Sequence, residues 1–260
     1  MLTLKKEKHF GNGLVSCYET EDKFLIETTD TFLPYYTKDA IGRKDNSLVS
    51  NDYGSRLERW LIGVSVCSGC NVGCKFCATG QMKKYRPLTS AEIVEQVTTV
   101  TSKYSQLPSE SQELKINYTR MGDFALNLEN VQNAIKEIDK LYPNVHHFVS
   151  TIGIKGSDFS WIKDNITLQI SLHSLDENRR NYLIPYKNKM TVEELGKIRT
   201  KSNLKTTVNM TLVDENDFNI EVLKKYFDPE YFFLKISPLN KNNISDRNNL
   251  DGIIKTENKG

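Results

Sequence analysis

The chain has 260 residues, and its 35 basic side chains nearly balance its 33 acidic ones, which gives a formal net charge of +2. A hydrophobic content of 38% and a mean hydropathy of −0.50 are typical of a globular protein. No apolar run approaches the roughly 20 residues that a membrane-spanning helix needs. Since the net charge is so small, a polyanionic partner would have to meet local basic patches.

The amino terminus reads Met-Leu-Thr-Leu-Lys-Lys and lacks the apolar core of a signal peptide. We therefore expect a cytoplasmic protein with no membrane partner, in which the five cysteines stay reduced and available to metal.

Residues 1–55 are predicted to form an N-terminal β extension and connector. The runs at 14–18 and 24–28 are β-branched or aromatic and are separated by a polar turn, which is typical of a β-hairpin. The segment around 38–56 is rich in Asp, Asn, Ser and Gly and is predicted to be a connector.

Residues 56–240 are predicted to form an α/β domain, because short β-branched or aromatic runs alternate there with helical patterns. Apolar residues recur at helical spacing in 91–100 and 128–138, and Thr89-Ser90 offers an N-cap to the first of these helices. Right-handed βα units of this kind curve into a partial (β/α)6 barrel. The six predicted strands are Leu61–Val66, Leu114–Arg120, His147–Thr151, Leu168–His173, Thr206–Val213 and Tyr231–Ser237. Residues 241–260 are dominated by Asn, Lys and Asp and are predicted to be a polar, solvated C-terminal tail.

The spacing Cys70-x3-Cys74-x2-Cys77 is the most informative motif of the chain. A cubane [4Fe–4S] cluster is normally held by four thiolates, so a loop that offers three leaves one iron open to a small molecule. Gly69 and Gly73 permit backbone turns that a Cβ would obstruct. The motif predicts a catalytic iron–sulfur site.

The sequence disfavours two other uses of these thiols, a zinc site and a disulfide. Cys67 adds a fourth thiol, which is enough for a tetrahedral zinc site, but structural zinc sites usually divide their ligands into two separated pairs. A disulfide is disfavoured because nothing in the sequence indicates an oxidising compartment.

The Cx3Cx2C motif, with Phe76 between its last two cysteines, resembles the signature of the radical S-adenosylmethionine (SAM) superfamily. The functional groups of βα barrels gather at the carboxyl ends of the strands, where this chain has small or hydrogen-bonding residues. Over residues 60–240 these motifs resemble the class A methyltransferases of the RlmN/Cfr type, which methylate adenosine in RNA. By this resemblance the SAM contacts are Gly122, Asp123, Ser150, Ser171, Leu172, His173 and Asn240, and the cluster ligands are Cys70, Cys74 and Cys77.

Two departures from that family stand out. Its strand-two segment usually reads Gly-Met-Gly-Glu-Pro, whereas Asp123 keeps the charge on a shorter side chain. The family also needs two further cysteines for methyl transfer, one seven residues before the first cluster cysteine and one near the C-terminus. This chain has Gly63 at the first position, and no cysteine follows Cys77.

The resemblance implies that reductive cleavage of SAM yields methionine and a 5′-deoxyadenosyl radical, which abstracts hydrogen from a substrate. It also implies an external electron donor of the flavodoxin or ferredoxin type and a water-poor site. Because both methyl-transfer cysteines are missing, our main hypothesis is hydrogen abstraction from an unidentified substrate. The alternative is RNA adenosine methylation, and the second alternative is a non-enzymatic iron–sulfur or zinc protein that binds a partner or senses redox state.

Two basic stretches interleaved with aromatics bear on the substrate, namely 83–86 and 179–189. Arg180, Pro185 and Lys187 of the second stretch fall where the family has a basic, proline-containing segment. Both stretches are expected near the cofactor and could meet the phosphates of a nucleic acid or nucleotide. A small molecule or a peptide is the other possibility. The histidines at 146 and 147 and both tryptophans are predicted to be core or rim residues.

Overall fold

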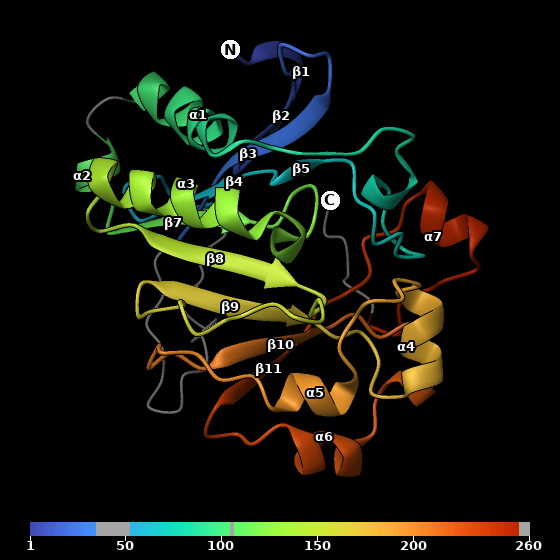
Figure 1. The fold of residues 1–260 in the computed structure, drawn as a ribbon. Coiled ribbons are helices and arrows are strands. Elements are labelled where there is room, and N and C mark those ends of the chain that lie inside the picture. The colour runs from blue at the N-terminus through green and yellow to red at the C-terminus, as the bar shows by residue number, and fades with distance from the viewer. Residues whose placement is uncertain (35–52, 105–106, 255–260) are drawn as a thin grey trace. The chain divides into compact units, whose positions relative to one another are not determined.

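The computed structural model describes residues 1–34, 53–104 and 107–254 (Figure 1). They fall into two compact units. The first comprises 1–66, 88–120 and 129–147, and the second comprises 67–87, 121–128 and 148 onward. Most of the predicted polar connector lies outside the described residues. Among the helices that are described, none combines the length and the apolar character needed to cross a membrane.

The first unit is built on a sheet with the order β1-β2-β3-β4-β7. Strands β1 to β4 pair antiparallel in chain order, and β4 pairs parallel with β7. The bounds are β1 Thr3–Phe10, β2 Gly13–Glu19, β3 Leu25–Leu33, β4 Arg59–Gly63 and β7 Glu113–Tyr118. The predicted hairpin is confirmed as β2 and β3. Strand β1 was not predicted, because its side chains are exposed along nearly the whole strand and show no apolar alternation.

Helices α1 (Ser90–Thr101) and α3 (Leu128–Leu141) confirm the two predicted helical patterns. Thr89 caps α1 in a capping box: its Oγ1 accepts a hydrogen bond from Glu92 N at 3.2 Å, and Glu92 Oε2 accepts one from Thr89 N at 2.8 Å. The chain between α1 and β7 also forms the 3-10 turn η3 (Ser102–Tyr104) and the short helix α2 (Leu107–Glu110).

Replacing Thr89 by Ala is expected to lower the free energy of unfolding by about 1 kcal/mol, because the cap side chain satisfies an amide that the helix cannot. Urea denaturation followed by circular dichroism measures this loss. Thr99→Ala, further along α1, is the matched control and should change the free energy of unfolding much less. Equal losses in both variants would contradict the importance of the cap.

Trp60 and His147 are core residues of the first unit, as predicted. Trp60 Nε1 donates to the buried carboxylate of Asp30 at 2.8 Å. His147 is buried between the hydroxyl of Tyr118 and the carboxylate of Asp139, at 3.0 Å from each. Their polar atoms are thus satisfied inside the unit.

Strand β8 (His146–Thr151) begins in the first unit and ends in the second, where the sheet order is β8-β9-β10-β11. Strands β9, β10 and β11 are parallel, with Thr207 of β10 opposite Gln169 and Asn209 opposite Ser171. The bounds are β9 Ile166–Ser171, β10 Thr206–Met210 and β11 Phe232–Ile236. All six predicted strands are therefore present, although β4 ends at Gly63 and not at Val66.

Short helices follow the strands of the second unit (Figure 1). They are η2 Thr79–Gln81, η4 Phe124–Asn127, α4 Glu177–Leu183, α5 Val192–Gly196, η5 Glu215–Asp217, α6 Ile220–Tyr226 and α7 Asn243–Arg247. A two-stranded sheet of β5 (Cys67–Ser68) and β6 (Arg86–Pro87) lies in the same unit.

The predicted solvated tail is wrong for the described part of 241–260. This segment forms α7, whose Ser245 is fully buried, and Leu250 after it is buried as well. The polar composition misled the prediction because the side-chain amides of Asn242 and Asn248 donate hydrogen bonds to the backbone of the protein itself.

Candidate functional site

The three motif cysteines lie in a loop of the second unit that follows β5. Gly69 and Gly73 have φ values of +71° and +73°, which confirms that these turns require glycine. The thiol of Cys74 interacts electrostatically with those of Cys70 and Cys77. The three cysteines therefore lie near one another in this loop, and their role as cluster ligands stays a prediction.

Side chains and backbone from distant parts of the unit hold this loop. Lys75 N donates to the carbonyl of Leu183 at the end of α4, at 2.9 Å. From the C-terminal segment, Asn248 Nδ2 donates to the Lys75 carbonyl and Asn242 Nδ2 donates to the Phe76 carbonyl, each at 2.9 Å. Nothing in the sequence indicates that this segment supports the cysteine loop.

Burial dominates the electrostatics of the thiols. It raises the pKa of Cys70 to about 12 and the pKa of Cys67 to about 11. The pKa of Cys74 is raised by burial too, and then by its cysteine neighbours. Thiols of this kind stay protonated in the protein alone and ionise when a cationic metal centre takes the place of the protons.

Apolar side chains pack around the first two cysteines of the motif. Cys70, Cys74 and Phe76 pack against a buried group made of Val72, Ile152, Ile154, Leu183, Ile184 and Leu250. Such a lining excludes water from the thiols, as an oxygen-sensitive or radical-generating centre requires.

Arg180 is a fully buried cation beside this loop. Its Nη1 donates to the carbonyl of Met190 at 2.6 Å and its Nη2 to that of Ile152 at 2.7 Å, while its Nε has no hydrogen-bond partner among the described residues. Burial lowers the pKa of Arg180 to about 10, and the nearby Glu177 and Cys74 oppose this shift.

Within the described part of the chain, no carboxylate lies at ion-pair distance from Arg180, so its charge is only partly compensated, by the more distant Glu177. A buried charge without a partner is strongly unfavourable. The family's basic segment pointed to Arg180 in the sequence, but not to its burial or its proximity to Cys74.

Gly122 and Cys67 are in close contact. A Cβ on Gly122 would lie 2.8 Å from Cys67 Sγ, and the residue has a φ of +94°. The Cys67 thiol donates a weak hydrogen bond to the hydroxyl of Tyr85 at 3.9 Å. Cys67 thus packs beneath the Gly122-Asp123 turn.

Gly122→Ala is expected to lower the free energy of unfolding by more than about 3 kcal/mol, since it adds a steric clash to the strain of a positive φ. Gly156 is the matched control, because its φ is +84° but nothing lies within 4 Å of an added Cβ. Gly156→Ala should lower the free energy of unfolding by only about 1–2 kcal/mol. Urea denaturation of both variants checks this, and equal losses would contradict the clash.

Asp123 is buried and joins two strand ends. Its Oδ2 accepts from Ile152 N at 2.7 Å, and its Oδ1 accepts from Ala125 N at 3.0 Å. Burial raises the pKa of Asp123 to about 6, while the hydrogen bonds from Ile152, Thr151 and Ala125 oppose the shift. These three hydrogen bonds leave one of the four lone-pair sites of the carboxylate, so Asp123 can hold its turn and still accept from a ligand ammonium group.

Ser150 and Ser171 are paired at the carboxyl ends of β8 and β9, with 3.1 Å between their hydroxyls. His173 is buried two residues further on, and its Nδ1 accepts from Thr211 N at 3.1 Å. Burial, helped by the charge of Arg180, lowers the pKa of His173 to about 3. The ring is therefore neutral and carries its proton on Nε2.

The structure gives less support to the two remaining predicted SAM contacts, Leu172 and Asn240. The side chain of Leu172 is fully buried, and its N–H donates to the carbonyl of Asn209, so neither group is left for a ligand. Asn240 is exposed, although Leu239 before it packs against the apolar group behind the cysteines.

The second basic stretch, residues 179–189, is less exposed than a phosphate-binding surface would need to be. Arg180 and Lys189 are buried, and Arg179 pairs with Asp214 and Asp217 at 3.6 and 3.4 Å. These cations therefore do not form a solvent-facing patch. Lys83 and Lys84 of the first stretch are exposed.

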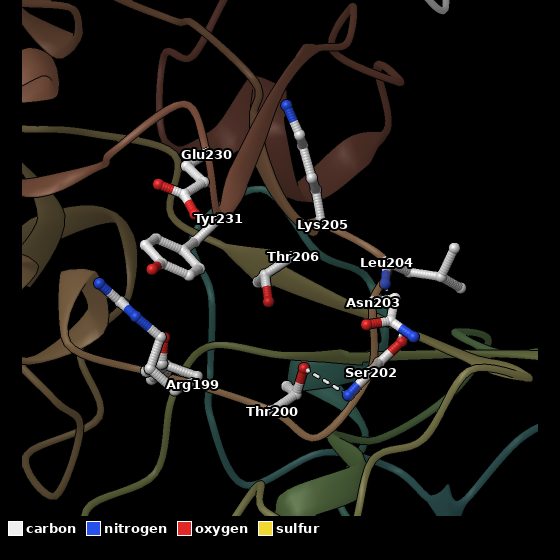
Figure 2. A pocket seen from close by; sticks show the side chains of 10 residues that line it. Arg199, Thr200, Ser202, Asn203, Leu204, Lys205, Thr206, Glu230 and Tyr231 are labelled. Atoms are coloured by element: carbon white, nitrogen blue, oxygen red, sulfur yellow. Dashed lines mark hydrogen bonds between the residues drawn. The ribbon is translucent and has the colours of Figure 1, made fainter.

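A pocket of about 270 Å³ lies elsewhere in the second unit, at the amino ends of β10 and β11 (Figure 2). The guanidinium of Arg199 lies over the ring of Tyr231, 4.1 Å from its centre, and the Lys205 ammonium donates to the carbonyl of Pro229. None of the predicted site residues lines this pocket.

The residues present fit a three-thiolate cluster better than a single zinc ion. Among the described residues, no three His, Cys, Asp or Glu side chains converge on one point that a metal ion could occupy. A cubane cluster needs no such convergence, because each thiolate binds a different iron. The orphaned Nε–H of Arg180 suits an anionic centre beside Cys74.

Comparisons with known proteins agree with this geometry. Residues 64–227 match the family model described as Radical SAM superfamily. A protein of Chlorobium phaeobacteroides named "probable dual-specificity RNA methyltransferase RlmN" is 32% identical over 201 residues, which cover 74% of this chain and 55% of the relative. A protein of the same name from Shouchella clausii is 30% identical over 224 residues, covering 78% and 62%. The chain thus spans less than two thirds of these relatives.

Among solved structures, a radical SAM methyltransferase from Sphaerobacter thermophilus is similar in fold. The TM-score is 0.69 at 24% sequence identity, and the match covers 92% of this chain and 67% of the other.

Proposed function

Because the chain belongs to the radical SAM superfamily, we propose that Cys70, Cys74 and Cys77 hold its [4Fe–4S] cluster and that the enzyme uses SAM to modify RNA. Membership confirms the predicted partial-barrel fold, the enzyme class and the use of a cluster with SAM. The observation that carries the ligand assignment is the pair of desolvated thiols of Cys70 and Cys74, with Cys77 near Cys74, beside the guanidinium of Arg180, which has no ion-pair partner among the described residues.

In this proposal the cluster supplies the electron that cleaves SAM. The chain's own residues bind SAM and orient it. Asp123 would accept from the amino group of SAM with its remaining lone pair, and the hydroxyls of Ser150 and Ser171 would hold the adenosyl part of SAM. The apolar group behind Cys70 and Cys74 keeps water away from the thiols. An external electron donor of the flavodoxin or ferredoxin type completes the system.

RNA is the substrate class that the relatives support, since those reported above are named RNA methyltransferases. They support the alternative drawn from the sequence, RNA methylation, better than the main hypothesis of hydrogen abstraction from an unidentified substrate. Exposed Lys83 and Lys84, close to the cysteine loop in the chain, are suited to contact phosphates.

A second candidate function is hydrogen abstraction from RNA without methyl transfer. It is favoured by Gly63, because the methyl-carrier route needs a thiol at that position. Cys67 is no evident substitute, since it is fully buried under Gly122.

One experiment separates the two. The reconstituted enzyme, RNA, a reductant and SAM with a deuterated methyl group are incubated anaerobically, and the RNA nucleosides are analysed by mass spectrometry. Deuterated methyl groups in RNA together with S-adenosylhomocysteine indicate methylation. RNA-dependent 5′-deoxyadenosine without S-adenosylhomocysteine indicates the second candidate. Products that do not depend on RNA would contradict the proposed substrate class.

A further inference from the structure

Gln169 is a buried polar side chain that the proposed site does not yet use. It lies in β9 two residues before Ser171, and only 9% of it is exposed. Because side chains alternate along a strand, Gln169 and Ser171 face the same side of the sheet, with Thr207 and Asn209 beside them on β10.

One end of the Gln169 amide is anchored and the other is not. Nε2 donates to Ser150 Oγ at 3.1 Å, and Ser150 in turn bonds to Ser171 at 3.1 Å. Oε1 is buried and has no hydrogen-bond partner among the described residues. A buried acceptor without a donor is unfavourable, so such groups in native proteins usually meet a partner.

We propose that Oε1 of Gln169 accepts a hydrogen bond from an N–H or O–H group of a nucleoside bound against Ser150 and Ser171, which makes Gln169 a specificity-determining residue. The inference rests on the proposed function, which places the adenosyl part of SAM at these serines. Both the adenosyl part of SAM and a nucleoside of RNA carry donors of this kind, on the ribose and on the base.

A ligand that lacks the relevant donor leaves Oε1 unpaired, so the site should reject it. The test measures equilibrium binding to the reconstituted enzyme of 5′-deoxyadenosine and of three relatives, which lack the 2′-hydroxyl, the 3′-hydroxyl or the exocyclic amino group. We expect one of the three relatives to bind the unsubstituted enzyme at least tenfold more weakly than 5′-deoxyadenosine does.

Two variants of Gln169 make the test specific. Gln169→Leu removes the acceptor, so the tenfold penalty should shrink to less than threefold. Gln169→Glu keeps an acceptor at the same place and should retain the penalty. If Gln169 served only to hold Ser150, both variants would weaken the binding of all four compounds by the same factor. The penalty would then be unchanged in Gln169→Leu, and this result would overturn the inference.

Competition identifies the source of the donor. Displacement of 5′-deoxyadenosine by SAM, with the penalty sensitive to Gln169, assigns the contact to the cofactor. Displacement by RNA and not by SAM assigns it to the substrate. An enzyme that cleaves SAM but shows penalties insensitive to Gln169 refutes the inference alone, whereas a protein that neither cleaves SAM nor binds any of the compounds contradicts the proposed function as well.

Discussion

Serine in place of Cys70, Cys74 or Cys77 is expected to abolish SAM cleavage, with a loss of at least a thousandfold in each single variant. In the proposed cluster each thiolate would bind its own iron, and the serine hydroxyl is a much weaker ligand for iron than a thiolate. Iron and sulfide content after anaerobic reconstitution, and the visible absorption of the cluster, should fall along with the activity.

Cys67→Ser and Cys17→Ser are the matched controls. Cys67 lies three residues before Cys70 and is also desolvated, but its thiol is directed to the hydroxyl of Tyr85. Cys17 lies in β2 of the first unit. Both variants should keep a full complement of iron. Loss of the cluster in Cys67→Ser, with retention in Cys77→Ser, would contradict the ligand assignment.

Arg180→Gln is expected to lower the rate of SAM cleavage at least tenfold and to speed the loss of iron to a chelator by a similar factor. The guanidinium is a buried positive charge beside Cys74, so it stabilises an anionic cluster and favours uptake of a further electron. A tenfold change corresponds to about 1.4 kcal/mol. A redox titration followed by electron paramagnetic resonance should show that the cluster of the Arg180→Gln variant is reduced at a lower potential than the cluster of the parent enzyme.

Arg179→Gln is the control for this effect. Arg179 is adjacent in α4, but its charge is already paired with Asp214 and Asp217. The Arg179→Gln variant should keep the cluster potential of the parent enzyme and should cleave SAM at a rate within twofold of the parent rate. A cluster that is reduced at the same potential in Arg180→Gln and in the parent would show that Arg180 only braces the carbonyls of Ile152 and Met190.

The sequence was sufficient for the six predicted barrel strands, the N-terminal hairpin, the cysteine loop and its glycine turns, because these follow from local spacing and from apolar alternation. It missed β1, whose side chains are nearly all exposed, and the folding of the tail, whose Asn242 and Asn248 form internal hydrogen bonds. It also could not show that Arg180 is buried beside Cys74 or that Gln169 anchors the serine pair. Those features depend on contacts between residues that are far apart in the chain.

A cluster held by this loop should cleave SAM when it is reduced. The most direct measurement is the yield of 5′-deoxyadenosine and methionine when the anaerobically reconstituted protein is incubated with dithionite and SAM. We expect the two products in equal amounts, none without reductant, and about four irons per chain. A protein that binds a single zinc ion, or that holds iron but forms no 5′-deoxyadenosine, would contradict the account.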